Sequence, residues 1–477
     1  MSDTRSLKEA QSRYSAANAA RISRELAEER EKHKFIIVVL DDDPTGIQTV
    51  HGIPVYTDWK QETLNDAFRQ DDDLFFILTN SRSFLSDRTL REHQIIAERL
   101  AEASRGSGRE FLLISRGDST LRGHYPLETD TLRETLEDVF GQTFHGEIIC
   151  PFFPEGGRYT IDDIHYVAYG DTLIPAGDTE FAQDKTFGYK SSHLGKWVEE
   201  KTGGRYPSDH VMSISLEALR DCAWDEITQR LCVVNSFQKI IVNALDYSDV
   251  QSFCVPLLRS LGKGKRFLFR TAAAFPKVIG GVGDKALLTR KELIGDNAFG
   301  GLIIVGSHVN KTTRQLERLK ELSNVEQIVF DQHLVLDTLR IEEEVKRVVD
   351  LCERNISNGK HTAVVTRRDR LDLNTGNKDN ELQIAVAISD ALTAVVSRLS
   401  IQPGFLIAKG GITSSDVGVK GLCVKKAMVL GQVRPGIPVW RTGAESKFPG
   451  MSYIIFPGNV GRDEDLRDIV SQMTGEE

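Results

Sequence analysis

Phe35-Ile36-Ile37-Val38-Val39-Leu40-Asp41-Asp42-Asp43-Pro44-Thr45-Gly46 is the stretch of sequence that decides the fold. Its apolar run is rich in β-branched residues and too short to span a bilayer, so it predicts a strand buried on both faces. Three carboxylates and a Pro-Thr-Gly turn signal follow at once. Ligands of open α/β sheets bind at the carboxyl ends of the strands, so we interpret the acids as functional rather than as an exposed turn. Their repulsion predicts that at least one has a raised pKa or is neutralised by a cation or a donor.

The same pattern of a buried strand followed by a polar loop recurs downstream. Apolar runs at 74–79, 111–115 and 147–150 predict three more strands, with helices between them over about 90–100 and 127–140. Each strand runs into a loop of Asp, Ser, Arg and Gly, and these loops should converge on one rim of a mostly parallel sheet. Strands return at 240–244 and 267–270, whereas 159–204 shows no clear periodicity and is expected to be a flap or irregular structure.

A glycine-bearing connector over about 280–300 predicts a boundary, after which a second α/β series begins. Its strands are expected at 302–305, 327–330, 362–366, 405–408, 439–440 and 453–456, with a long helix over 381–399. We therefore predict an α/β protein of two domains with mostly parallel sheets and an active site in the inter-domain cleft. The expected parts are an N-terminal helical extension (1–33), a first domain (34–290) and a second domain (300–477).

Composition narrows the classes of function. The 477 residues carry a net charge of −9, which disfavours a general binder of nucleic acid or anionic membrane. Six scattered cysteines form no Cys-x-x-Cys pair, and no apolar run reaches membrane-spanning length, so we expect a cytoplasmic protein. The histidines lack the spacing of metal ligands, and no protein metal ligand is predicted.

Two kinds of loop could bind ligands. In the first half the cations Arg82, Arg116, Arg122 and Arg158 each follow a strand, and arginine holds carboxylates in a bidentate fork. In the second half three small-residue loops follow strands: 306–308, 409–416 and 457–461. Glycine lets backbone N–H groups approach a ligand, so three such loops in one domain indicate a nucleotide-phosphate site, although none is a Walker A loop.

These motifs resemble those of the four-carbon acid sugar kinase family over about residues 35–470. The segments that carry the resemblance are Asp42-Asp43-Pro44-Thr45-Gly46, Asp118-Ser119-Thr120-Leu121-Arg122-Gly123, Pro151 to Thr160, Gly306-Ser307, Gly410-Gly411-Ile412-Thr413-Ser414 and Pro457-Gly458-Asn459-Val460-Gly461. The resemblance implies a sugar-acid-binding N-terminal domain, a nucleotide-binding C-terminal domain, and phosphorylation of threonate, erythronate or 3-oxo-tetronate by ATP. Pro44 and Ser115-Arg116-Gly117 depart from the usual family pattern, which leaves the identity of the acid open.

The resemblance also implies roles for individual residues. Those expected to contact ATP are Ser307, Gly410, Gly411, Ile412, Thr413 and Gly458. Those expected to line the acid site are Asp42, Asp43, Arg82, Asp118, Ser119 and Arg122, with Arg158 added from its place after a strand. Asp43 or Asp42 should take the proton of the acceptor hydroxyl. Mg²⁺ should bridge the phosphates, and the expected partners are the sugar acid and ATP, with a homodimer as an option.

Two alternatives stay open at this point. A haloacid-dehalogenase-like phosphatase begins with a strand and Asp-x-Asp-x-Thr, which Asp41-Asp42-Asp43-Pro44-Thr45 satisfies. That class also needs an acidic pair after a later strand, and Asp162-Asp163 follows no predicted strand. The other alternative is a non-catalytic regulator that binds nucleotide or sugar acid.

Overall fold

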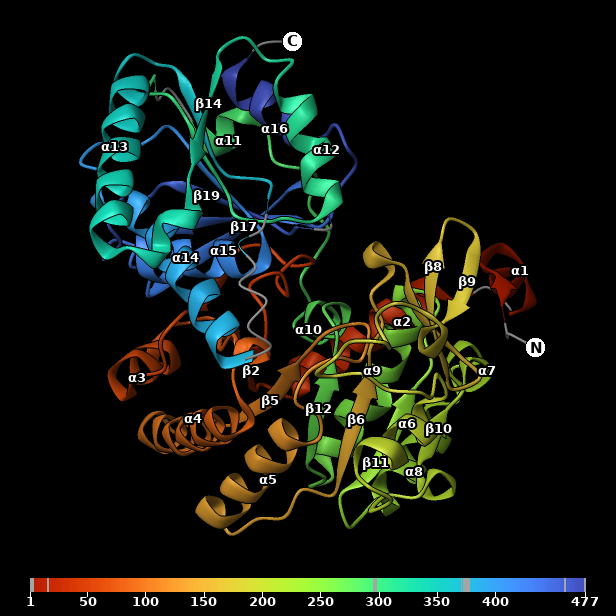
Figure 1. Cartoon of the computed structure of the whole chain (residues 1–477). Helices are drawn as coiled ribbons and strands as arrows, with labels where there is room; N and C mark the ends of the chain where they lie inside the picture. Colours follow the sequence, from red (N-terminus) through yellow and green to blue (C-terminus); the bar gives the residue numbers. More distant parts are fainter. Residues whose placement is uncertain are drawn as a thin grey trace. The chain divides into compact units, whose positions relative to one another are not determined.

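The computed structural model describes residues 4–14, 17–294, 298–369, 371, 378–458 and 460–475. The chain divides into two compact units, each of the α/β class. The first unit comprises Met1–Gly46 and Asp58–Gly283, and the second comprises Ile47–Thr57 and Asp284–Glu477. The predicted fold class is confirmed, with two α/β domains and mostly parallel pairing (Figure 1). Residues 47–57, which the sequence placed in the first domain, belong to the second unit.

The first unit is built on a parallel sheet in the strand order β10-β11-β6-β12-β5-β2-β4. Its strands are β2 (Ile36–Asp41), β4 (Leu74–Leu78), β5 (Phe111–Arg116), β6 (Gly146–Cys150), β10 (Met212–Ile214), β11 (Gln238–Val242) and β12 (Phe267–Thr271). Every residue of β2, β4, β6 and β12 is buried, as expected for strands covered on both faces. The predicted apolar runs therefore form the centre of this sheet.

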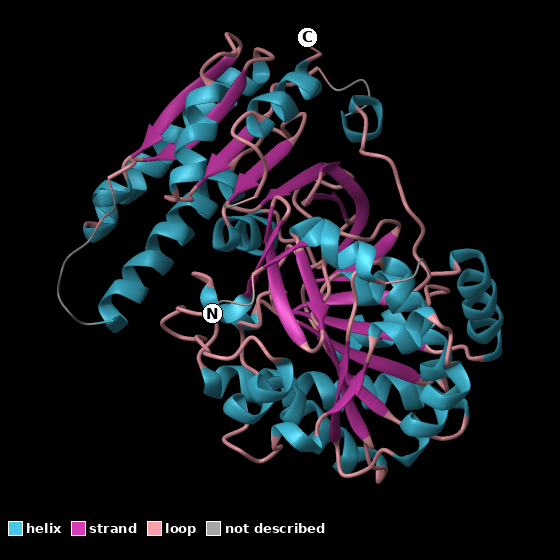
Figure 2. Cartoon of the chain, turned by 90° about the vertical axis from the view of Figure 1, so that its right-hand side faces the viewer, coloured by secondary structure: helices cyan, strands magenta, loops and turns pink. Residues whose placement is uncertain are grey.

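Helices cover this sheet (Figure 2). One group packs together as α3 (Gln61–Arg69), α4 (Ser86–Ser107) and α5 (Leu127–Phe140). A second group packs around α9 (Tyr247–Gly262), and it includes α2 (Ala19–Lys32), α7 (Leu216–Arg220), α8 (Trp224–Val233) and α10 (Ala274–Ile279). The N-terminal extension thus contains the predicted helix, and it is held to α9 by ion pairs from Arg259 to Glu25 and Glu29.

The segment expected to be a flap or irregular structure supplies most of a small antiparallel sheet. Its order is β1-β9-β8-β7, formed by β1 (Arg5–Ser6), β7 (Arg158–Ile161), β8 (Ile164–Tyr169) and β9 (Thr172–Pro175). The sequence missed these strands because each is short and only partly apolar. Asp162 and Asp163 form the tight turn between β7 and β8, and both have positive φ, which Asp tolerates better than most residues.

The second unit combines a parallel and an antiparallel region, in the order β3-β17-β18-β19-β16-β13-β15-β14. The strands are β3 (Ile53–Tyr56), β13 (Leu302–Val305), β14 (Val325–Phe330), β15 (His361–Thr366), β16 (Leu406–Lys409), β17 (Lys426–Arg434), β18 (Ile437–Thr442) and β19 (Ser452–Phe456). Pairing from β19 to β14 is parallel, and pairing from β3 to β19 is antiparallel.

The helices of the second unit surround one core. They are α11 (Arg290–Ile294), α12 (Asn310–Leu319), α13 (Thr338–Ser357), α14 (Lys378–Arg398), α15 (Gly411–Asp416) and α16 (Asp465–Thr474). Ile303, Ile407 and Ile454 of the sheet pack with Leu316 of α12 and Ile469 of α16. Within the described residues, no helix combines the length and apolar character needed to cross a membrane.

Candidate functional site

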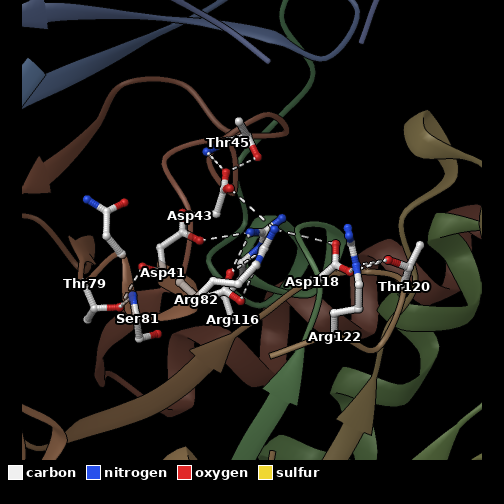
Figure 3. A network of polar contacts seen from close by, with 12 residues as sticks. Asp41, Asp43, Thr45, Thr79, Ser81, Arg82, Arg116, Asp118, Thr120 and Arg122 are labelled. Atoms are coloured by element: carbon white, nitrogen blue, oxygen red, sulfur yellow. Dashed lines mark hydrogen bonds and ion pairs between the residues drawn. The ribbon is translucent and has the colours of Figure 1, made fainter. Parts of the chain in front are cut away.

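Three neighbouring strands of the first unit end at the same rim, and the predicted charges lie at their ends or in the loops that follow them (Figure 3). Asp41 ends β2 and pairs with Leu78 of β4 and Arg116 of β5. The chain then turns through Asp42 and Asp43, whose neighbours come from the loops after β4 and β5. The rule that parallel strands present their carboxyl ends together thus brings Asp42, Asp43, Arg82 and Asp118 into one cluster.

Arg82 is the hub of this cluster. Its Nε and Nη2 donate to the two carboxylate oxygens of Asp42 at 3.0 and 2.6 Å, in a bidentate fork. Its Nη1 lies 3.4 Å from Asp43 Oδ2 and 3.9 Å from Asp118 Oδ1. One guanidinium therefore neutralises part of the charge of three acids, which is one of the two outcomes expected from their repulsion.

Asp41 shows the other outcome. Burial, together with repulsion from the Asp42 and Asp43 carboxylates, raises the pKa of Asp41 to about 7 against the opposing effect of the Arg116 guanidinium. Arg116 Nη1 donates to Asp41 Oδ1 at 3.0 Å. A Cβ on Gly46 would lie 2.1 Å from the same oxygen, so the Asp turn closes over this carboxyl group. Asp41 is thus a buried support for the rim rather than a group that faces a ligand.

Asp43 and Asp118 stay ionised in this setting. Burial opposes the charge of Asp43, but Arg82, Thr45 and Arg116 outweigh it and lower the pKa of Asp43. The Thr45 hydroxyl donates to Asp43 Oδ1 at 2.5 Å and its backbone N–H donates to the same atom at 2.9 Å. Burial likewise opposes the charge of Asp118, and Arg82 and Arg122 lower its pKa in spite of it. The Asp43 side chain is 20% exposed, whereas that of Asp42 is 2% exposed.

Two further predicted arginines share an aromatic partner that the sequence did not indicate. Arg122 Nε donates to Asp118 Oδ2 at 2.7 Å, and its guanidinium lies 5.2 Å from the ring centroid of Phe181. The Arg158 guanidinium lies 5.3 Å from the same centroid and donates to the carbonyl of Gly156. Phe181 lies in the segment without periodicity, so nothing in its sequence neighbourhood predicted this contact. Among the described residues, Arg158 makes no salt bridge.

Ser119 and the loop after β5 are fixed from below by buried groups. The Ser119 carbonyl lies 2.7 Å from His165 Nε2, and Tyr189 donates to the Thr120 carbonyl at 2.8 Å. Arg270, at the end of β12, donates to the Arg122 carbonyl at 3.0 Å. A Cβ on Gly117 would lie 1.3 Å from Arg270 Nη1, so the loop passes directly over this guanidinium. Arg270 was not predicted as a site residue, although a charge inside an apolar strand is a signal that could have indicated it.

In the second unit the predicted small-residue loops also meet. Lys409, at the end of β16, pairs with Val305 of β13 on one side and with Phe456 of β19 on the other. The ends of these three strands are therefore adjacent. Thr312 Oγ1 donates to the Gly458 carbonyl at 3.1 Å and lies 3.0 Å from Ser307 Oγ. A Cβ on Gly458 would lie 2.8 Å from Ser307 Oγ. Asn459 of the third loop lies outside the described residues.

The loop after β16 leads directly into helix α15. Gly410 has φ +130°, and a Cβ there would lie 3.0 Å from Thr413 Oγ1, so two constraints favour glycine. The first backbone bond of α15 runs from Ser414 N to the Gly410 carbonyl at 2.9 Å, so the N–H groups of Gly411, Ile412 and Thr413 precede the helical bonding pattern. The Ile412 side chain is 63% exposed.

Arg368 is a residue of this region that the sequence analysis missed. Its Nη1 donates to the Ser307 carbonyl at 2.7 Å and its Nη2 donates to Thr313 Oγ1 at 2.9 Å. It follows β15, and nothing in its local sequence distinguishes it from a surface cation. Arg368 therefore braces the first small-residue loop from a neighbouring strand.

Neither cluster contains a ready set of metal ligands. In the part of the chain that the structure describes, no group of three or more His, Cys, Asp and Glu side chains is arranged to hold a metal ion. The rim carboxylates are instead engaged by arginines. A Mg²⁺ that arrives with a nucleotide would take phosphate oxygens and water as its main ligands, and we assign it no protein ligand.

The phosphatase alternative does not fit this geometry. Its nucleophile would be Asp41, which is 1% exposed, paired with Arg116 and closed off by Gly46. The expectation that Asp162-Asp163 follows no strand was wrong, because both residues follow β7 directly. They form a hairpin turn, however, where Asp162 pairs with Arg5 and Asp163 accepts a hydrogen bond from Asn243.

Two family models of known domains match the chain. Residues 37–279 match the family model of a sugar-binding N-terminal domain, and residues 302–466 match that of a nucleotide-binding C-terminal domain. The first match contains the acidic rim, and the second contains the three small-residue loops. No curated protein matches the chain by sequence.

Solved structures show the same fold. A Salmonella typhimurium LT2 protein, provisionally named a tRNA synthase, is 15% identical with a TM-score of 0.63, covering 90% of this chain and 97% of its own. A Haemophilus influenzae protein from a domain family of unknown function is 17% identical with a TM-score of 0.60, covering 92% of this chain and 100% of its own. At these identities the likeness concerns the fold alone.

Proposed function

We propose that this chain, which belongs to the four-carbon acid sugar kinase family, transfers the γ-phosphoryl group of ATP to a hydroxyl group of a short sugar acid. One observation carries the proposal. The sugar-binding match and the nucleotide-binding match each contain one dense cluster of strand-end residues, and the two clusters have opposite chemistry: acids and arginines in one, glycines and hydroxyls in the other.

The rim of the first unit suits an acid that also carries hydroxyl groups. Arg158 makes no salt bridge among the described residues, so it can bind a carboxylate. Arg122 pairs with Asp118 at 2.7 Å and with Asp184 at 3.7 Å, and its remaining N–H donors can add to such a site. Asp118, kept ionised by Arg82 and Arg122, can accept a hydrogen bond from a hydroxyl group. Arg82, Asp118, Ser119, Arg122 and Arg158 remain our candidates for substrate binding.

Of the two candidate bases, Asp43 fits the role better than Asp42. Both oxygens of Asp42 are held by the Arg82 fork and its side chain is almost fully buried. Asp43 is ionised and partly exposed, so it can accept the proton of an acceptor hydroxyl as the phosphoryl group is transferred. We assign Asp43 as the general base and Asp42 as the group that positions Arg82.

The second unit would hold ATP through backbone groups. The N–H groups at the start of α15 and the Ser307 hydroxyl can bind phosphate oxygens, which glycine at 410, 411 and 458 allows to approach closely. The exposed Ile412 side chain offers an apolar contact for the nucleoside. Mg²⁺ bound to the phosphates would neutralise charge that develops during transfer.

A coupled assay of ADP formation tests the proposal. The protein is incubated with ATP, Mg²⁺ and a panel of four- and five-carbon sugar acids that includes 3-oxo forms. ADP formation should depend on one or a few acids and be absent without them. Binding of ATP or an acid without turnover across the whole panel would favour a non-catalytic regulator instead.

A further inference from the structure

The loop after β19 is held by its carbonyl oxygens. Lys409 Nζ donates to the Pro457 carbonyl at 3.0 Å, and Thr312 Oγ1 lies 3.1 Å from the Gly458 carbonyl. Further along, side chains of α12 reach three more carbonyls: Gln315 Nε2 reaches those of Val460 (3.2 Å) and Arg462 (2.8 Å), and Lys311 Nζ reaches that of Gly461 (2.9 Å). We call residues 457–458 and 460–462 the anchored loop.

This anchoring orients the other half of each peptide group. In a planar trans peptide the carbonyl of one residue and the N–H of the next point in opposite directions. With the carbonyls of Pro457 and Val460 turned toward Lys409 and Gln315, the N–H groups of Gly458 and Gly461 turn away from these donors. A backbone N–H group that turns away from such an anchor is able to bind an anion.

Lys409 is an unusual member of the anchoring set because it is a cation inside the fold. It ends β16 with 0% exposure, and its ammonium group lies 3.6 Å from the ring centroid of Phe456. The charged groups that face it are Lys311 of α12 and Asp465 of α16. Asp465 already binds Arg462 through its backbone N–H at 2.7 Å and its guanidinium at 3.0 Å. Within the described residues Lys409 makes no salt bridge, and burying such a charge is unfavourable unless something else requires it.

We propose that Lys409 is a positioning residue for the nucleotide: its ammonium group fixes the anchored loop and supplies positive charge beneath the phosphates. The proposal rests on the proposed function, since it assumes that the anchored loop belongs to the ATP site. It adds a residue that the resemblance does not name, and it accounts for an unpaired buried cation at the junction of three strand ends.

If Lys409 has this role, the affinity for nucleotide should fall as the pH rises. Burial lowers the pKa of Lys409 to about 7, repulsion from Lys311 lowers it as well, and Asp465 opposes both. A bound phosphate favours the protonated ammonium group. Below pH 7 the lysine is already charged, whereas above pH 7 binding must also take up a proton. Affinity should therefore fall as the pH rises through about 7.

Titration of ATP into the full-length protein by calorimetry, at pH 6 and pH 8.5, tests this. Wild type should bind ATP more weakly at the higher pH. Lys409→Met should weaken ATP binding at pH 6 by about tenfold or more. It should also lose most of the pH dependence, so that only the dependence caused by the titration of ATP itself remains. Lys409→Arg stays charged at both pH 6 and pH 8.5. Its affinity for ATP should therefore change between the two only as much as the titration of ATP itself requires. Lys426→Met is the matched control: it removes a strand lysine of the same unit that lies over the Tyr56 ring, and it should behave as wild type.

A second variant keeps the test decisive if Lys409→Met does not fold. Thr312→Val removes the hydroxyl that reaches Gly458 while keeping shape and charge, and it should weaken ATP binding several-fold without changing the pH dependence. Lys409→Met that folds and binds ATP as wild type does at pH 6, or Thr312→Val with unchanged affinity, would overturn the proposal. If wild type itself bound no ATP, the proposed function would fail, so the two failures are distinguishable.

Discussion

The strand ends of the two units present opposite chemistry. The first unit gathers charged side chains, and a single guanidinium, that of Arg82, contacts Asp42, Asp43 and Asp118. The second unit presents small residues and backbone groups, and its described residues include one fully buried lysine, Lys409, at the end of β16. Side-chain charges can discriminate among acids and move protons, whereas backbone groups bind phosphate independently of protonation. The difference predicts that mutations in the first unit affect turnover and those in the second affect ATP binding.

The largest effect should come from Asp43→Asn. Loss of the general base should lower kcat by about 10²–10⁴-fold, because proton transfer from the acceptor hydroxyl loses its acceptor. ATP affinity, measured by calorimetry, should stay unchanged. Asp66→Asn, which alters an exposed carboxylate on α3, is the control and should keep full activity. A large loss of ATP affinity in Asp43→Asn would contradict the division between the units.

The next effect concerns stability and pH. The pKa of Asp41 is raised to about 7 by burial, so folding favours its protonated form. The stabilisation that protonated Asp41 gives the folded state is fully present below the pKa that Asp41 has in the unfolded chain. It is lost as the pH rises through about 7, the pKa of Asp41 in the folded state. We expect the free energy of unfolding of the first unit, measured by urea titration, to fall between pH 5 and pH 8 by an amount on the order of 2–4 kcal/mol. Asp41→Asn should flatten this dependence, and an equal dependence in the variant would exclude Asp41 as its source.

The smallest effect should come from Gly410→Ala. The added Cβ would meet Thr413 Oγ1 at 3.0 Å and strain a backbone with φ +130°, so the loop must shift. We expect ATP affinity to fall by about tenfold, as a strain of 1–3 kcal/mol suggests, while kcat at saturating ATP changes little. Gly450→Ala is the matched control, since Gly450 also has positive φ in the second unit but has open space around it. Equal losses of affinity in both variants would point to general strain rather than to the ATP site.

Much of this fold could be predicted from the sequence because its strands are continuous apolar runs. The apolar run at 302–305 coincides with β13, and the helix expected at 127–140 coincides with α5. β17 was missed, although Ala427, Val429, Gly431 and Val433 alternate as buried positions. Apolar Met428 and Leu430 on its other face obscured that period of two. The small sheet around 158–175 was missed for the related reason that its strands are too short to show a pattern.

The candidate site was predictable only where it is local to a strand end. Asp43, Arg82 and Asp118 directly follow strands, so sheet topology alone brings them together. Phe181 and Arg368 reach their clusters through tertiary contacts with no local signal. The burial of Lys409 was also hidden, because the sequence placed it in a loop, whereas it is the last residue of β16.

The most direct test of the account follows the phosphorus atom. The protein is incubated with ATP labelled at the γ-phosphate and the four-carbon sugar acid that supports ADP formation, and the products are separated. In wild type we expect the label to move to an ester of the acid, one ester per ADP formed, whereas Asp43→Asn should form neither product at a comparable rate. Label released as inorganic phosphate regardless of the acid, or hydrolysis of sugar-acid phosphates without nucleotide, would contradict it.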